Sequence, residues 1–252
     1  MSFDVKGKIA LITGSTKGIG RAIAEALAEN GASVVIVSRH QNDCDAVAAG
    51  ISKKYGAETL AVAADITKQE QIDQLVAKAV ARFGRIDVLV NNAGSAITKK
   101  AEDLTEADWD RVVNLDLRAV FFTAQAVGRQ MIAQKSGKII NISSILGLVA
   151  DKQVLPYCVS KGGVLQMTKA LALEWAKHNI QVNAICPGYV ITEINRDFLT
   201  DEKASAGLLR KTVMRRFGQV EEIAGAAVFL ASGASSYMTG QQIVIDGGWT
   251  AE

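Results

Sequence analysis

Short apolar runs alternate with longer amphipathic stretches along the whole chain. Runs rich in β-branched residues, such as 8–13 and 33–38, predict strands, and the continuous apolarity of the first indicates burial on both faces. Residues 18–30 then show helical spacing, and Asn30 with Gly31 predicts where that helix ends. Further strands are predicted at 59–64, 86–91, 138–143, 180–185 and 242–247, and further helices at 42–55, 68–82, 106–134, 156–178 and 219–232.

This alternation predicts an α/β fold with a single Rossmann-type, doubly wound parallel sheet of about seven strands and helices on both faces. Ligands of such sheets bind beyond the carboxyl ends of the strands, so residues that follow each strand are the first candidates for a site. The chain has 252 residues, two prolines and no linker-like segment. We therefore expect one dinucleotide-binding catalytic domain over 1–252, with a helical substrate lid at about 189–217.

Composition narrows the classes of partner. The formal net charge is only +2, which gives no electrostatic reason to expect nucleic acid or a membrane surface. No apolar run approaches the roughly 20 residues of a membrane span, and the first residues do not resemble a signal peptide. Cys44, Cys158 and Cys186 form no metal-binding spacing. We expect a cytoplasmic protein with free thiols, no metal, no nucleic acid and no membrane partner.

A glycine-rich loop, TGSTKGIG at 13–20, joins the first predicted strand to the first helix. Gly14, Gly18 and Gly20 allow a tight turn and let a pyrophosphate approach the free amides of the helix N-terminus. The spacing is GxxxGxG and differs from GxGxxG, while Arg21 excludes the Walker phosphate loop. For the glycines alone, a plain strand-to-helix turn is the alternative interpretation.

This loop resembles the TGxxxGxG signature of the short-chain dehydrogenase/reductase family, and the resemblance extends over essentially the whole chain. Residues 178–189 are similar to the gluconate 5-dehydrogenase and glucose-dehydrogenase-like branches. The resemblance implies an oxidoreductase that transfers a hydride between a nicotinamide cofactor and a carbonyl or secondary alcohol. It implies cofactor contacts from Gly14, Ser15, Thr16, Lys17, Gly18, Ile19 and Gly20.

The segment after the second strand addresses the choice of cofactor. An acidic residue there binds the ribose hydroxyls of NAD, whereas an arginine accommodates the 2′-phosphate of NADP. This chain has Ser38, Arg39 and His40 and no acid, and Lys17 lies in the glycine loop. In the family, a basic residue at either place is associated with NADP. We expect NADP as the preferred cofactor and NAD as the alternative, which would apply if Lys17 and Arg39 are only solvated surface charges.

Three further segments match the family after later strands. Asp65, with Ile66, stands where the family contacts the adenine, although Asp65 also suits the N-cap of the next helix. NNAG at 91–94 and PGYVIT at 187–192 match the groove-lining and carboxamide-binding motifs, and Asn91 would brace the sheet. The resemblance implies cofactor contacts from Asn92, Ala93, Gly94, Pro187, Gly188, Val190 and Thr192, and also from Tyr157 and Lys161.

Tyr157 and Lys161 form a YxxxK pair within a predicted helix. Residues four apart on a helix share a face, and a free tyrosine, with a pKa near ~10, is a poor base at neutral pH. A nearby ammonium favours the phenolate and makes proton transfer effective. A YxxxK pair by itself is weak evidence, because most such pairs are solvated side chains.

The family resemblance completes a catalytic set around this pair. Ser144 lies thirteen positions before Tyr157 at the end of a predicted strand, and is preferred over Ser143. Asn114 stands where the family anchors a proton-relaying water. The resemblance implies that Tyr157 donates the proton, Lys161 assists it and contacts the ribose, and Ser144 orients the carbonyl.

The substrate is the least determined part of the interpretation. A ketone, sugar or polyol is expected as the small-molecule substrate, and a 3-oxoacyl-[acyl-carrier-protein] reductase is the alternative. In that branch two arginines dock the carrier, whereas Lys135 and His178 stand at the matching positions. A non-catalytic NADP-binding scaffold is the alternative from another class, but such relatives usually lose the tyrosine, the lysine or a loop glycine. The resemblance also implies a homotetramer.

Overall fold

A single parallel sheet organises the chain in the computed structural model, which describes residues 3–193 and 195–251. Within these residues the strands lie in the order β3-β2-β1-β4-β5-β6-β7, and every neighbouring pair is parallel. The predicted fold class is thereby confirmed. The strands are β1 (Ile9–Thr13), β2 (Ser33–Ser38), β3 (Thr59–Ala63), β4 (Val88–Asn91), β5 (Gly137–Ile142), β6 (Ile180–Pro187) and β7 (Gln242–Ile245).

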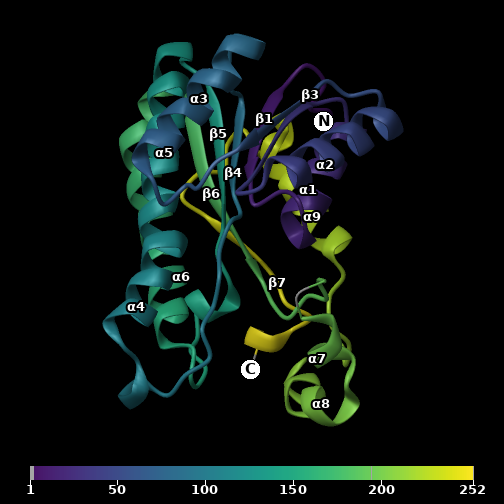
Figure 1. The fold of residues 1–252 in the computed structure, drawn as a ribbon, viewed down its shortest axis with the longest axis vertical. Helices are drawn as coiled ribbons and strands as arrows, with labels where there is room; N and C mark the ends of the chain where they lie inside the picture. Colours follow the sequence, from purple (N-terminus) through teal and green to yellow (C-terminus); the bar gives the residue numbers. More distant parts are fainter. Residues whose placement is uncertain (1–2, 194, 252) are drawn as a thin grey trace.

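Helices cover both faces of the sheet (Figure 1). One face carries α1 (Gly18–Glu29), α2 (Gln41–Tyr55) and α9 (Val220–Ala231), and the other carries α3 (Gln69–Phe83), α5 (Ala119–Gln134) and α6 (Leu155–Trp175). Beyond the carboxyl ends of the strands lie α4 (Glu106–Val113) on one side and α7 (Arg196–Thr200) with α8 (Glu202–Lys211) on the other. Short helical turns occur at Ala101–Asp103, Ile145–Gly147, Ala176–His178, Gly233–Ser235 and Trp249–Ala251.

The central strand β1 shows why its sequence is apolar throughout. Ala10 and Ile12 point into the core under α1 and α9, while Ile9 and Leu11 point into the core under α3, α5 and α6. Ala10 pairs with residues of both β2 and β4. Because both faces and both edges of this strand are covered, alternation of polar and apolar residues would leave buried polar groups.

The strand order switches direction at β1, whose two neighbours are β2 and β4. Connections leave this point toward opposite edges of the sheet, so a crevice opens between the carboxyl ends of β1 and β4. The glycine loop follows β1 and the NNAG segment follows β4. The topology therefore brings the two glycine-containing motifs to the same crevice.

The predicted helix at 106–134 is divided in the structure. A five-residue π-helical turn, Asn114–Arg118, separates α4 from α5, and both flanks keep right-handed helical backbone angles. A π turn is wider than an α turn, is rare and frequently occurs at functional sites. The hydrophobic pattern continues through this turn, so it carried no signal for the interruption.

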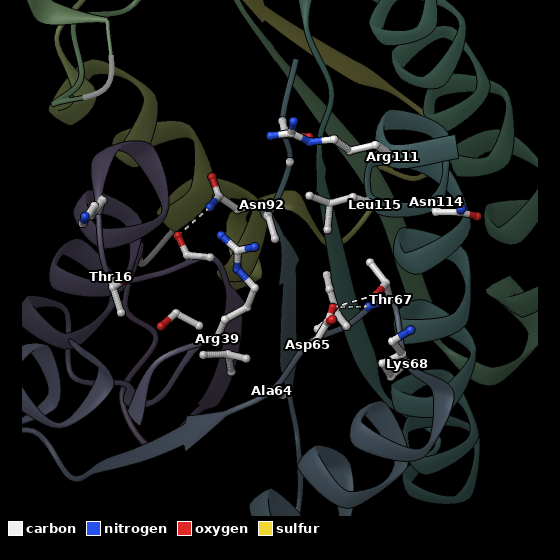
Figure 2. A pocket seen from close by; sticks show the side chains of 18 of the residues that line it. Thr16, Arg39, Ala64, Asp65, Thr67, Lys68, Asn92, Arg111, Asn114 and Leu115 are labelled. Atoms are coloured by element: carbon white, nitrogen blue, oxygen red, sulfur yellow. Dashed lines mark hydrogen bonds between the residues drawn. The ribbon is translucent and has the colours of Figure 1, made fainter. Parts of the chain in front are cut away.

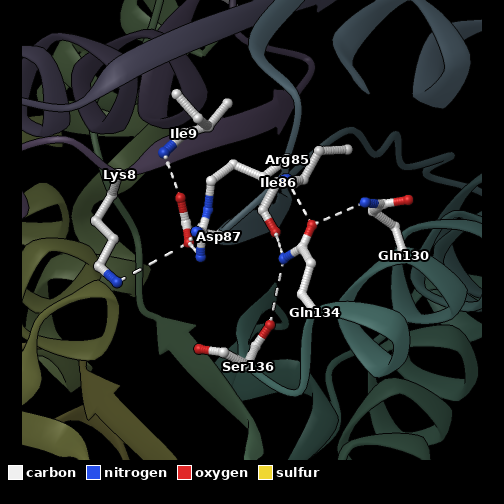
Figure 3. A network of polar contacts seen from close by, with 8 residues as sticks. All are labelled: Lys8, Ile9, Arg85, Ile86, Asp87, Gln130, Gln134 and Ser136. Atoms are coloured by element: carbon white, nitrogen blue, oxygen red, sulfur yellow. Dashed lines mark hydrogen bonds and ion pairs between the residues drawn. The ribbon is translucent and has the colours of Figure 1, made fainter. Parts of the chain in front are cut away.

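A polar cluster fastens the amino ends of the central strands, at the end opposite the crevice (Figure 3). The buried Asp87 carboxylate accepts a hydrogen bond from Ile9 N at 3.0 Å and pairs with Arg85 and, at 3.9 Å, with Lys8. Gln134 of α5 bonds both backbone groups of Ile86. These contacts join β1, β4 and α5 without touching the crevice.

Candidate active site

A cleft of about 1010 Å³ lies at the carboxyl ends of the strands, beside the switch point (Figure 2). Its walls come from the segments that follow β1, β2, β3 and β4 and from the helical stretch around the π turn. Of the residues predicted to contact a cofactor or to act in catalysis, the lining includes Gly14, Thr16, Lys17, Gly18, Ile19, Ser38, Arg39, Asp65, Ile66, Asn92, Ala93, Gly94, Asn114 and Thr192.

The glycine loop needs its glycines for two different reasons. Gly14 and Gly18 adopt φ values of 63° and 53°, in the left-handed region that favours glycine. At Gly20 the obstacle is space, because a Cβ would lie 2.2 Å from Asn92 Nδ2 and 2.4 Å from the Gly14 carbonyl oxygen. Gly20 therefore lets α1 pack closely on the loop, and it does not itself line the cleft.

Thr13 and Asn92 hold the loop after β1 against the segment after β4. Asn92 Nδ2 donates to the carbonyl oxygens of Thr13 and Gly14, each at 3.0 Å, and Thr13 Oγ1 accepts from the backbone N–H groups of Asn92 and Ala93. Asn91 donates to Asn141 Oδ1 and so braces the sheet, as expected. Ser15 is fully buried and bonds Ile12 and Val37, so its role is to shape the loop.

The N-terminus of α1 binds an anionic side chain of the same protein. Gly18 N donates to the Glu193 carboxylate at 3.0 Å. A carboxylate at this place has the charge and acceptor oxygens that a pyrophosphate would bring, and both are favoured by the free amides and the helix dipole. The loop residues therefore fit a dinucleotide phosphate. No local feature of the sequence predicts this role for Glu193, because the contact depends on the folding of the segment after β6.

Lys17 and Arg39 both line the cleft and are exposed. Figure 2 shows the Arg39 side chain within the cleft, near Asp65. Burial alone would raise the pKa of Asp65, but hydrogen bonds from Thr67, helped by Lys68 and Arg39, lower it. The Asp65 carboxylate closes a turn with Thr67 and does not cap α3, whose N-cap residue makes no side-chain cap.

The proposed catalytic pair lies near the start of α6, where Pro156 occupies the first turn. Tyr157 is half-buried, and the Lys161 side chain is only 4% exposed. Lys161 Nζ lies 5.4 Å from the centre of the Tyr157 ring and donates to the Ile142 carbonyl oxygen at 3.0 Å. The ammonium is thus fixed between the end of β5 and the tyrosine.

Asp116, from the π turn, is the counter-charge of Lys161. Its Oδ2 lies 3.3 Å from Lys161 Nζ, and its side chain is 0% exposed. Burial alone would lower the pKa of Lys161, but the attraction of Tyr157 and Asp116 outweighs it and the pKa is raised. Sequence reasoning missed Asp116, although an acid within the apolar run VNLDLRAVFF was an available signal.

The two serines after β5 have different partners. Ser143 Oγ donates to the carbonyl oxygen of Lys161 at 2.9 Å, which ties β5 to α6. Ser144 caps the turn Ile145–Gly147 and accepts from Leu146 N at 3.1 Å. The backbone of Gly147 packs on Lys161, since a Cβ there would lie 2.7 Å from the Lys161 carbonyl oxygen. Ser143 is therefore structural, and Ser144 keeps its hydroxyl hydrogen for another partner.

The remaining predicted residues surround these features. Asn114 begins the π turn and lines the cleft, and in Figure 2 its side chain points away from Arg39 and Asp65. Val190 pairs with Gly218 in an isolated bridge, and Asn195 Nδ2 bonds its carbonyl oxygen. Predicted residues outside the cleft lining are Ser15, Gly20, Ser144, Tyr157, Lys161, Pro187, Gly188 and Val190.

Among residues 3–193 and 195–251, no group of three or more His, Cys, Asp or Glu side chains is placed to hold a metal ion. No helix in this part of the chain is long and apolar enough to cross a membrane.

The doubly wound sheet, the glycine loop at its switch point and the adjoining tyrosine–lysine pair are those of a dinucleotide-dependent oxidoreductase. A family model described as enoyl-(acyl carrier protein) reductase matches residues 14–250. The NAD-dependent glycerol dehydrogenase of Listeria innocua is 42% identical, covering 98% of this chain and 96% of that protein. The 3-oxoacyl-[acyl-carrier-protein] reductase of Thermotoga maritima is 40% identical, covering 97% of this chain and 98% of that protein.

A solved structure is also similar over nearly the full length. The gluconate 5-dehydrogenase of Burkholderia cenocepacia, crystallised with NADP and tartrate, is 40% identical with a TM-score of 0.95, covering 99% of this chain and 98% of that one. This chain belongs to the short-chain dehydrogenase/reductase family. It is an NAD(P)-dependent oxidoreductase that acts on CH–OH groups or the corresponding carbonyls.

Proposed function

We propose that this protein is an NADP(H)-dependent dehydrogenase of sugar acids or polyols, with Asn114, Ser144, Tyr157 and Lys161 as its catalytic set. One observation carries the proposal: the buried Lys161 ammonium is fixed 5.4 Å from the Tyr157 ring, beside a cleft whose loop fits a dinucleotide. A cation held there stabilises negative charge on the phenolic oxygen while the proton is transferred.

The chain's own residues act on protons and on orientation. NADPH, when bound, supplies the hydride. Tyr157 donates a proton to the carbonyl oxygen during reduction and accepts one from the alcohol during oxidation. Ser144 donates a hydrogen bond to the same oxygen and stabilises negative charge on it. Lys161 supports the charge on the tyrosine and contacts the ribose of the cofactor, and Asn114 supports proton supply to the lysine.

NADP is proposed as the preferred cofactor because Lys17, from the loop after β1, and Arg39, directly after β2, both line the cleft, and no acid directly follows β2. Two cations there would pair with a 2′-phosphate and would be left unpaired by NAD. The relatives divide on this point, since one is named as NAD-dependent and another was crystallised with NADP. The proposed preference for NADP over NAD therefore rests on the residues of the cleft.

A hydroxyl-rich substrate is supported by the polar groups near the pair. The Tyr189 hydroxyl donates to Asp151 Oδ2 at 3.3 Å, and these residues come from the segments after β6 and β5. Burial, together with the nearby Asp151, raises the pKa of Tyr189, so it remains a neutral hydrogen-bonding phenol. The relatives named for glycerol and gluconate act on substrates of this kind.

We also propose a single catalytic domain over 1–252, with 189–217 as the substrate lid, assembled as a cytoplasmic homotetramer. The lid is supported by α7 and α8, which lie beyond the carboxyl ends of the strands (Figure 1). Assembly is supported by apolar side chains exposed near β7, and a reducing compartment by three free cysteines.

Replacement of the proposed proton donor tests the mechanism. Tyr157→Phe should lower kcat by about 10³-fold or more, because it removes the transferable proton, while NADPH affinity changes less than about threefold. Turnover is followed by nicotinamide absorbance with gluconate, glycerol and a 3-oxoacyl thioester, and binding by cofactor fluorescence. Tyr55→Phe, remote from the cleft, is the matched control. Near-normal turnover in Tyr157→Phe would refute the mechanism. If the unsubstituted protein acts on the 3-oxoacyl thioester alone, the proposed substrate class is refuted.

A further inference from the structure

Asp116 lies at a junction between the cofactor cleft and the proposed catalytic lysine. Its two carboxylate oxygens have different partners: Oδ1 accepts from Ser95 N at 2.8 Å, and Oδ2 lies 3.3 Å from Lys161 Nζ. Ser95 lines the cleft, whereas Asp116 does not. The carboxylate therefore connects the segment after β4 to the ammonium on α6.

The surroundings leave little room for this carboxylate to move. A Cβ on Gly94 would lie 2.7 Å from Asp116 Oδ2 and 3.4 Å from Lys161 Nζ, so the backbone of Gly94 packs directly on the pair. The π turn places Asp116 on the side of the helix that faces α6. Asp116 is completely buried and the Lys161 side chain is 4% exposed, so water does not screen their attraction.

The groups that face Lys161 come from four elements, one of which is β5 with Ile142. Asp116 approaches from the π turn, Tyr157 from α6 itself and Cys186 from β6, and the Ile142 carbonyl oxygen accepts one N–H. Burial raises the pKa of the Cys186 thiol to about 11, so it is neutral at working pH. In the resting protein Asp116 is therefore the anion that offsets the burial of the ammonium among these groups. Without it, a buried lysine tends to lose its proton.

We infer that Asp116 is a positioning residue for the reaction: it holds the Lys161 ammonium in place and keeps the proton on Lys161 when Tyr157 gives up its own. The inference rests on the proposed roles of Tyr157 and Lys161. On this inference, Asp116 determines that the proton leaves Tyr157 and not Lys161. Burial raises the pKa of Asp116, and the attraction of Lys161 with the Ser95 hydrogen bond acts against that rise.

The pH dependence of alcohol oxidation tests this inference through Asp116→Asn, which keeps the acceptor for Ser95 and removes the charge. Loss of a nearby anion makes proton loss from the tyrosine–lysine pair easier, so the midpoint of the kcat profile should move down by about one pH unit or more. The plateau should fall about tenfold, because part of the lost proton then comes from Lys161. NADP affinity should change less than about threefold.

Asp87→Asn is the matched control, since it removes another buried, ion-paired carboxylate at the far end of the sheet. It should lower thermal stability and leave the pH midpoint in place. An unmoved or raised midpoint in Asp116→Asn would overturn the inference. Tyr157→Phe separates the two proposals. If Tyr157→Phe stays active, the proposed function fails. If Tyr157→Phe is inactive and the pH midpoint of Asp116→Asn equals that of the unsubstituted protein, only the inference fails.

A stability cycle covers the case in which Asp116→Asn folds poorly. With Lys161 present, the substitution leaves a buried ammonium unpaired and should lower the unfolding midpoint. In a Lys161→Met background, Asp116→Asn removes a buried carboxylate that has lost its partner, so it should raise the unfolding midpoint. Equal losses in both backgrounds would show that Asp116 has only a packing role, and would overturn the inference.

Discussion

At the residue scale, the site uses cations in two different environments. Lys161 is buried against a carboxylate and a carbonyl oxygen, so its charge acts strongly on the neighbouring tyrosine. Lys17 and Arg39 line the cleft and are exposed, so water weakens their fields. The first environment suits proton transfer, and the second suits the recognition of a charged group.

The exposed cations give the first prediction at this scale. Arg39→Asp should change the ratio of kcat/KM for NADP over NAD in favour of NAD by about 100-fold or more, because a carboxylate repels the 2′-phosphate and accepts hydrogen bonds from the ribose hydroxyls. The ratio is measured at constant ionic strength, with Arg82→Asp on α3 as the control. An unchanged ratio would show that Arg39 does not contact the phosphate.

Lys138 gives a prediction about pH and stability. Its amine donates to Ser235 Oγ, and burial, with Lys8 nearby, lowers its pKa from 10.5 to about 8. Below pH 8 the amine is charged in both the folded and the unfolded chain, and burial of the charge lowers the free energy of unfolding. Between pH 8 and 10.5 the unfolded chain holds more protons, so this group's contribution to stability rises with pH.

Lys138→Met removes that cost and should stabilise the fold at pH 7 by roughly 1 kcal/mol, since one pKa unit corresponds to about 1.4 kcal/mol and the amine is only partly buried. The gain should shrink at pH 10. Urea unfolding at both pH values measures it, with Lys78→Met on α3 as the control. A gain that is equal at the two pH values would contradict the assigned cause.

At the scale of elements, the two ends of the sheet perform different tasks. The carboxyl ends carry loops with glycine, asparagine and serine, and the amino ends carry the Asp87 cluster that joins β1 and β4 (Figure 3). Asp87→Asn should lower the free energy of unfolding by about 1–3 kcal/mol, because it removes charged hydrogen bonds whose partners are half-exposed. Turnover per folded molecule should remain normal, and urea unfolding with an activity assay tests both statements.

The π turn is the element that most changes the interpretation of the sequence. The predicted single helix at 106–134 contained both Asn114 and Asp116, but helical spacing alone did not relate either residue to α6. The wider turn brings Asp116 to Lys161 and leaves Asn114 at the cleft. The contact between the π turn and α6 is a tertiary feature, and residue type along the predicted helix does not record it.

At the scale of the whole molecule, one region of the surface is unusually apolar. Leu173 of α6 is 85% exposed, Tyr237 is fully exposed and Val244 of the edge strand β7 is partly exposed. A Cβ on Gly240 would lie 3.4 Å from Ala172 Cβ, so the segment before β7 adjoins α6. Contact with other copies of the chain would remove these side chains from water.

For the proposed homotetramer, the double substitution Leu173→Asp with Tyr237→Asp should therefore reduce the particle mass to less than four times that of one chain, because buried charges oppose association. Size-exclusion chromatography with light scattering measures it. Phe3→Asp, which alters an exposed ring packed on Phe229, is the control. A tetramer that survives the double substitution would place the contacts elsewhere.

The sequence by itself determined the fold class and the order of the elements, and its resemblance to the family predicted the phosphate loop and the Tyr157–Lys161 pair. These features are local: strand apolarity, glycine positions and the one-turn spacing of a helix are all read within about twenty residues. The tertiary structure alone decided that Asp116 pairs with Lys161, that Ser143 is structural and that Glu193 bonds Gly18, 175 positions away. Such contacts depend on how separate elements pack, and burial then sets the strength of each charge in the site.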